Sequence, residues 1–172
     1  MSTSRFAEQL NSQIGHEFAA HQQYVAIAVH YDALTMPAMA TYFYQKAMEE
    51  RDHAMMMVRF LIDTDGEVTI PGSDAPQSRF DDIVAPVALA LDQEKRVTTQ
   101  IHALTRIARD ENDFAAEQFM QWFIKEQVEE VAAMNDLLTV VTRAKDDIQY
   151  IEGYASTRPS GDDPTAPSVA GV

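Results

Sequence analysis

Apolar residues recur along most of this chain in alternating steps of three and four, which is the spacing of one face of an α-helix. Four long segments carry such a stripe, and proline occurs in them only within the first turn or not at all. We expect helices in these four segments and in a shorter one that follows, at about residues 5–34, 37–64, 84–110, 113–142 and 145–156. The pattern therefore predicts an all-α fold.

The connections between these segments indicate how the helices are arranged. The first and second segments are joined by a short link, as are the third and fourth, so each pair should run antiparallel. The second and third are separated by roughly 19 residues, enough to span the ~42 Å length of a 28-residue helix. These two helices should then be parallel, which is the arrangement of a ferritin-like four-helix bundle with one long crossover.

The chain divides into two parts by composition. Residues 158–172 are rich in Pro, Gly, Ser and Asp, and we expect this tail to be disordered. Residues 1–157 should form one domain, the bundle with its short fifth helix.

Each of the four long stripes is apolar at both ends and carries a carboxylate near its middle. These carboxylates are Glu17, Glu50, Glu94 and Glu130. Because the midpoints of bundle helices share one layer, the four side chains should meet in the core. Unpaired buried carboxylates cost several kcal/mol each. Since no lysine or arginine lies within the stripes, a bound cation or protons should compensate them.

His53 lies three residues after Glu50, so the two side chains are neighbours on one helix. Carboxylates with one imidazole suit iron or manganese better than structural zinc, which usually takes Cys or His. One Glu-x-x-His pair is a weak signal, but four carboxylates in register beside a histidine rarely arise by accident. We interpret His21 as a core histidine. A purely structural bundle with protonated or salt-bridged carboxylates is an alternative to the metal site.

Charge and composition narrow the classes of function. The chain has 13 Lys and Arg residues against 27 Asp and Glu residues, a formal net charge of −14. This acidity argues against nucleic acid and anionic membranes as partners. No stretch has the ~20 uninterrupted apolar residues of a membrane span. The chain has no cysteine, and its polar start lacks the apolar run of a secretory signal, so we expect a cytoplasmic protein.

At these residues the sequence resembles the ferritin family, and more particularly the non-haem ferritins of bacteria. The resemblance extends over nearly the whole chain. It is carried by Glu17 and Tyr24, by Glu49-Glu50-Arg51-Asp52-His53, by Glu94, and by Glu126-Gln127-Val128-Glu129-Glu130. It implies an iron-storage subunit, a ferroxidase that oxidises Fe(II) with O₂ or H₂O₂ and stores Fe(III) as a mineral inside a hollow homo-oligomer of about 24 subunits.

The resemblance also implies a paired iron site within the subunit. One iron would be held by Glu17, Glu50 and His53. The second would be held by Glu94 and Glu130, with Glu50 bridging the two ions.

The same resemblance implies roles for further residues. Gln127 would lie beside the ligands, and Tyr24 would hydrogen-bond the site and supply an electron. Glu49, Glu126 and Glu129 would form a third, more outward iron site, although a solvated acidic face explains them equally well.

Two departures from related families distinguish this chain. It carries Gln127-x-x-Glu130 where the symmetric di-iron pattern has a second Glu-x-x-His. Arg51 stands where haem-binding bacterioferritins have a methionine, so no haem site is expected. The alternative function is a soluble di-iron oxidase or peroxidase of the same fold that does not store iron.

Overall fold

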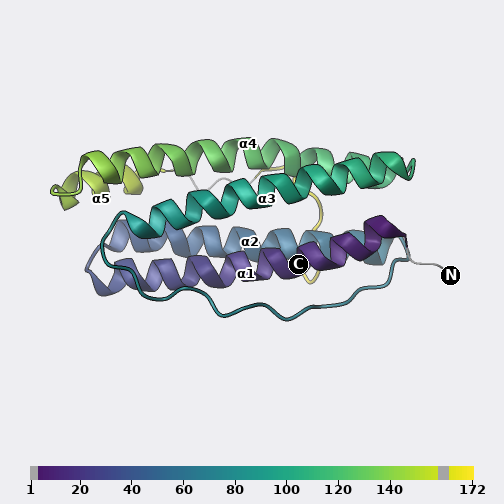
Figure 1. The fold of residues 1–172 in the computed structure, drawn as a ribbon, viewed down its shortest axis with the longest axis horizontal. Helices are drawn as coiled ribbons and strands as arrows, with labels where there is room; N and C mark the ends of the chain where they lie inside the picture. The colour runs from purple at the N-terminus through teal and green to yellow at the C-terminus, as the bar shows by residue number, and fades with distance from the viewer. Residues whose placement is uncertain (1–3, 159–162) are drawn as a thin grey trace.

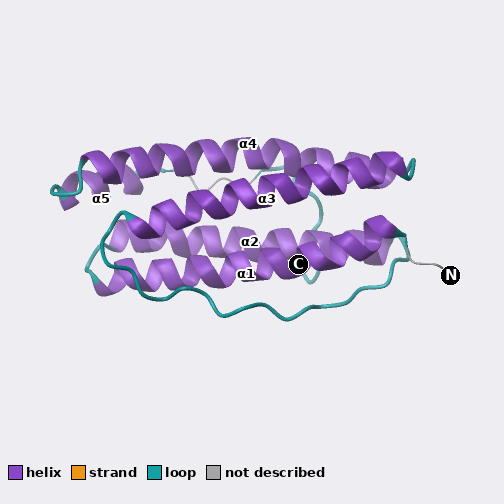
Figure 2. Ribbon diagram, in the orientation of Figure 1, coloured by secondary structure: helices purple, strands orange, loops and turns teal. Residues whose placement is uncertain are grey.

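The computed structural model describes residues 4–158 and 163–172, and this part of the chain forms helices and loops without strands (Figures 1 and 2). The helices are α1 (Arg5–Ala33), α2 (Pro37–Asp63), α3 (Ala85–Asp110), α4 (Phe114–Arg143) and α5 (Ile148–Ser156). The predicted all-α fold is confirmed, and so is the presence of a short fifth helix.

The four long helices form a bundle with one crossover (Figure 1). Helices α1 and α2 are antiparallel neighbours, and α3 and α4 form the second antiparallel pair. The loop after α2 runs the length of the bundle, and α3 therefore starts at the same end as α2 and runs parallel to it. Helix α5 lies against α2 and α4 at that end.

Local sequence signals set the helix boundaries. The side chains of Ser4, Asp113 and Asp147 accept hydrogen bonds from the first turns of α1, α4 and α5. Pro37 occupies the first turn of α2, where its missing N–H costs nothing. Asn112 lies in the left-handed region with φ of 57°, a conformation that asparagine tolerates, and this allows the tight reversal from α3 to α4.

The crossover is hydrogen-bonded to side chains of α1 along its path. The side chain of Asn11 donates to the crossover backbone and accepts from it, and Gln23 does the same with the backbone of Gln77, at 2.8 and 2.9 Å. Gly15 allows the closest approach, because a Cβ at this position would lie 2.6 Å from Cγ of Pro71. These contacts fix the long link in place although it forms no regular secondary structure.

The apolar core is divided into two clusters. One includes Tyr24, Tyr31 and Phe43, and the other includes Leu10 and Phe123. On each long helix the two clusters are separated by buried polar side chains, namely Glu17, Glu50, His53, Glu94, Gln127 and Glu130. Close packing on both sides therefore holds a polar layer at the middle of the bundle.

The C-terminal tail differs from the disorder expected from its composition. Residues 159–162 lie outside the described residues, but residues 163–172 are described and lie against α2 and α4. The carboxylate of Asp163 accepts hydrogen bonds from Trp122 at 3.0 Å and from Lys125 at 3.3 Å, and the backbone of Ala170 donates to that of Met55. Small apolar residues of the tail also pack on the core, a contribution that overall polarity does not reveal.

The contact between Asp163 and Trp122 can be followed by fluorescence, because Trp122 is the chain's single tryptophan. We expect Asp163→Ala to shift the tryptophan emission to longer wavelength, since the indole loses its hydrogen-bond acceptor and gains contact with water. Steady-state fluorescence of the assembled protein measures this shift. The exposed Asp74 provides the matched control, Asp74→Ala. An unchanged emission spectrum in Asp163→Ala would contradict the placement of the tail.

None of the helices in the described part of the chain combines the length and the apolar character needed to cross a membrane.

Candidate metal centre

The four carboxylates expected in one layer are all buried in the middle of the bundle. Glu17 of α1 and Glu94 of α3 are each 1% exposed, while Glu50 of α2 and Glu130 of α4 are 2% and 3% exposed. Their burial follows from their place in otherwise apolar stripes, which face inward along their whole length.

Glu17, Glu50 and His53 form the tightest group. Each offers one ligand atom, and these atoms all lie within 4.8 Å of one another. Nδ1 of His53 lies 3.4 Å from Glu50 Oε2 and 3.9 Å from Glu17 Oε2. The amide of Gln13 donates a hydrogen bond to Glu17 Oε1 at 2.9 Å. Glu17 Oε2 is buried and has no hydrogen-bond partner among the described residues. Two carboxylates and one imidazole facing one point form a donor set for a divalent cation.

Glu94 is not part of this group and accepts hydrogen bonds from other residues. The hydroxyl of Tyr24 donates to Glu94 Oε1, and the amide of Gln127 donates to Glu94 Oε2 at 3.1 Å. The same amide lies 3.2 Å from the hydroxyl of Thr98, one turn further along α3. Tyr24 and Gln127 therefore orient the carboxylate of Glu94.

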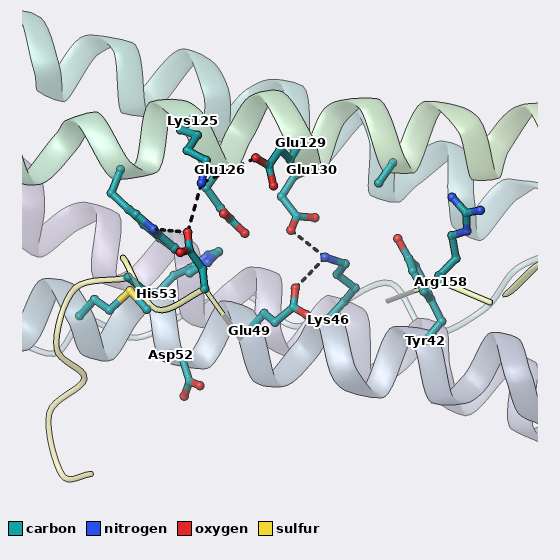
Figure 3. A pocket seen from close by; sticks show the side chains of 15 residues that line it. Tyr42, Lys46, Glu49, Asp52, His53, Lys125, Glu126, Glu129, Glu130 and Arg158 are labelled. Carbon is teal, nitrogen blue, oxygen red and sulfur yellow. Dashed lines mark hydrogen bonds and ion pairs between the residues drawn. The ribbon is translucent and has the colours of Figure 1, made fainter. Parts of the chain in front are cut away.

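Glu130 makes an ion pair that the sequence analysis did not anticipate. Nζ of Lys46 lies 2.7 Å from Glu130 Oε1 and 2.6 Å from Glu49 Oε2 (Figure 3). Lys46 is not a stripe residue, but it precedes Glu50 by four positions, and its long side chain reaches the core from the edge of α2. Lys46 therefore compensates Glu130 from outside the stripes, which themselves contain no lysine.

Burial controls the protonation of the centre when no metal is bound. Burial, followed by repulsion from neighbouring carboxylates, raises the pKa of Glu17 and of Glu50 well above the ordinary value. The same two causes raise the pKa of Glu94 to about 7, with Glu130 as the main neighbouring charge. The metal-free centre therefore holds protons near neutrality, and a divalent cation would displace them.

At Lys46 the neighbouring charges dominate over burial. Burial alone would lower the pKa of its ammonium, but the charges of Glu130 and Glu49 outweigh burial and raise that pKa. Lys46 therefore keeps its positive charge beside the centre.

The proposed accessory acids surround an open pocket of about 530 Å³ between α2 and α4 (Figure 3). Glu49 lines this pocket and forms an ion pair with Lys46. Glu126 is partly buried, and burial and the nearby charge of Glu130 raise its pKa. Glu129 is exposed, 3.9 Å from Lys125. The three acids share one pocket, but two of them already lie near lysines.

His53 and Glu130 also line this pocket, as does Asp163 of the tail. The pocket therefore connects the buried polar layer with the surface of the subunit, and the tail forms part of its wall.

His21, interpreted from the sequence as a core histidine, is only partly buried. Its Nδ1 lies 2.6 Å from the backbone oxygen of Ala47, so one ring nitrogen is used within the bundle. Arg51 lies beside Asp52 at 2.6 Å, and its side chain is 42% exposed.

Sequence reasoning missed Gln13, Thr98 and Lys46. Gln13 lies four residues before Glu17, Thr98 four residues after Glu94, and Lys46 four residues before Glu50. Each is thus one turn from a buried carboxylate, and polar residues at that spacing are the signal that would have identified them.

Comparisons with known proteins show similarity in sequence and in fold. A family model described as "Ferritin-like domain" matches residues 7–144. Ferritin BfrB of Mycolicibacterium smegmatis is 50% identical over 170 residues, which cover 98% of this chain and 94% of that protein. A bacterial non-heme ferritin of Staphylococcus aureus is 33% identical over 154 residues, covering 90% and 93%. A solved open-pore ferritin from Archaeoglobus fulgidus has a TM-score of 0.87 at 29% identity, covering 91% and 98%.

Proposed function

The chain belongs to the ferritin family and is an iron-storage subunit, and from this premise we propose which of its residues handle iron. Members of this family are ferroxidases. Fe(II) is oxidised in the buried polar layer, and the first ion binds to Glu17, Glu50 and His53. The observation that supports this assignment is the approach of three buried ligand atoms within 4.8 Å of one another.

The second ion of the pair binds to Glu94 and Glu130, with Glu50 as the shared ligand. Burial of all three carboxylates in one layer supports this assignment. Glu130 keeps one buried oxygen without a hydrogen-bond partner in the described part of the chain, and that oxygen is available to a cation. Binding here requires Glu94 to exchange a hydrogen bond for a metal bond, while Tyr24 and Gln127 act as positioning residues.

The reaction removes one electron from each of two Fe(II) ions. With O₂ as the acceptor, two electrons and two protons form H₂O₂; with H₂O₂ as the acceptor, two electrons and two protons form two molecules of water. Anionic ligands stabilise Fe(III) more than Fe(II), because the higher charge gains more from each carboxylate. The acidic layer thereby favours oxidation, and a shared ligand keeps the two ions at the separation that two-metal chemistry uses.

The oxidised iron is stored as a mineral inside a hollow homo-oligomer of about 24 subunits that binds no haem. The similarity to storage ferritins over nearly the whole chain supports the shell. Arg51 in place of a methionine supports the absence of haem.

Native mass measurement of the iron-loaded protein tests this proposal. A storage shell has a mass of hundreds of kilodaltons and retains far more iron than two ions per subunit. A small oligomer that oxidises Fe(II) without retaining it would instead identify the protein as a stand-alone di-iron oxidase. A Soret band in protein produced with added haem would contradict the proposed absence of haem.

The accessory acids Glu126 and Glu129 are expected to be dispensable for the first oxidation. The double variant Glu126→Gln with Glu129→Gln should oxidise the first two Fe(II) ions per subunit at nearly the wild-type rate, because these acids line the pocket outside the buried group. Later turnovers should slow, because the pocket then attracts cations less strongly. Stopped-flow absorbance with repeated additions of two Fe(II) per subunit measures both phases.

A second double variant, Glu8→Gln with Glu67→Gln, removes the same charge at two exposed positions away from the pocket and provides the matched control. If the pocket variant lost the first fast phase as completely as a ligand variant, the separation into a paired site and accessory acids would have to be abandoned.

A further inference from the structure

Lys46 lies between the paired site and the accessory acids. Its ammonium bridges Glu130 of α4 and Glu49 of α2, at 2.7 and 2.6 Å, and the side chain is only 12% exposed (Figure 3). Lys125, the other lysine of the pocket, is more exposed than Lys46, with a side chain that is 58% exposed. It lies near Glu129 and Asp163 and contacts neither Glu49 nor Glu130 within ion-pair distance.

An ammonium in this position resembles a bound metal ion. It is a compact cation between carboxylates from two helices, and it uses oxygens that a divalent ion would also use. Two carboxylates from different helices, at 2.7 and 2.6 Å, compensate its charge. The other oxygen of Glu130 is buried and has no hydrogen-bond partner in residues 4–158 and 163–172, so Lys46 satisfies this carboxylate only in part.

We propose that Lys46 is a tethered cation that limits the number of divalent ions held at this centre. It shares Glu130 with the second ion of the pair and weakens the binding of that ion, and by remaining on Glu49 it prevents a third ion from binding at the accessory acids. This inference rests on the paired site proposed above, and it concerns the count and relative affinity of the ions.

The proposal gives the two ions of the pair unequal affinities. The first ion binds at Glu17, Glu50 and His53 without displacing Lys46. The second must share Glu130 with the ammonium of Lys46 and bind close to its positive charge. Removing the ammonium should therefore strengthen binding of the second ion and open a place for a third between Glu49 and Glu126.

The experiment is a calorimetric titration of the metal-free, assembled protein with Zn²⁺, which has the charge of Fe(II) but does not undergo oxidation. We expect the wild-type protein to bind two ions per subunit, the second more weakly. Lys46→Gln should bind the second at least ~10-fold more tightly, about 1.4 kcal/mol, and should bind a third. Native mass spectrometry counts the ions independently of the heat signal.

Two further variants isolate the cause. Lys125→Gln removes the same charge from the mouth of the same pocket and should behave as the wild type. Lys46→Gln with Glu49→Gln removes one charge of each sign, which favours normal assembly. It should keep the tighter second ion but lose the third. If Lys46→Gln is poorly assembled, this double variant still tests the effect on the second ion.

Unchanged ion counts and affinities in both Lys46 variants would overturn the proposal, as would an equal effect of Lys125→Gln. Failure of the paired site itself is recognised separately with Glu50→Ala. If that variant still bound all its Zn²⁺ normally, the paired site would be wrongly assigned and the role of Lys46 would be rejected with it.

Discussion

The Glu50→Ala variant is expected to assemble normally and to oxidise the first Fe(II) ions at least ~100-fold more slowly than the wild type. Loss of a residue that only supports a metal ligand typically costs 10–100-fold in affinity or activity, and Glu50 is proposed to be a ligand of both ions. Burial and the neighbouring carboxylates disfavour the charged form of Glu50 in the metal-free protein, so its removal should preserve or increase stability. His53→Ala should have a similar effect, because it removes the imidazole of the first ion's ligand group.

Stopped-flow absorbance of Fe(III) after the addition of two Fe(II) per subunit measures the rate, and size-exclusion chromatography verifies the assembly. Glu8→Ala is the matched control, since Glu8 is an exposed glutamate in the first turn of α1. A wild-type rate in well-assembled Glu50→Ala or His53→Ala protein would show that oxidation takes place elsewhere.

The fold could be predicted because its determinants are local and repeated. Apolar spacing identified the four long helices, and local signals such as the Asp113 cap of α4 set their ends. The long link before α3 predicted the parallel arrangement of α2 and α3, because a chain of that length spans the bundle and a short turn does not. The path of the crossover was beyond prediction, because it depends on pairings such as Gln23 with Gln77 across 54 positions.

For the site, the sequence predicted which side chains are buried but not all of their contacts. The stripes correctly indicated that four carboxylates would be buried, since helical periodicity determines which direction a side chain faces. Periodicity does not determine where a long, flexible side chain ends. Lys46 starts at the edge of a stripe and finishes in the polar layer, and the tail reaches Trp122 through Asp163. Both depend on the three-dimensional proximity of oppositely charged or polar groups.

The same burial predicts an unusual dependence of stability on pH. The metal-free protein should become less stable as the pH rises from about 4.5 to about 7, the interval between the ordinary carboxyl pKa and that of Glu94 in the folded protein. Within this interval the folded state binds more protons than the unfolded state, so the free energy of unfolding decreases with increasing pH. The raised pKa values of Glu17 and Glu50 act in the same direction.

For Glu94 alone the loss is on the order of 3 kcal/mol per subunit across the interval. Thermal unfolding of the metal-free protein at pH 5, 6 and 7.5, with a chelator present and a fixed scan rate, should therefore give a falling melting temperature. Glu94→Gln should weaken this dependence, because its neutral amide has no proton to lose, while Glu17 and Glu50 still contribute. Added Zn²⁺ should reverse the dependence by replacing the protons with a cation. A melting temperature that instead rose steadily over this range, equally in the wild type and in Glu94→Gln, would mean that the buried carboxyl groups do not retain protons in the folded protein.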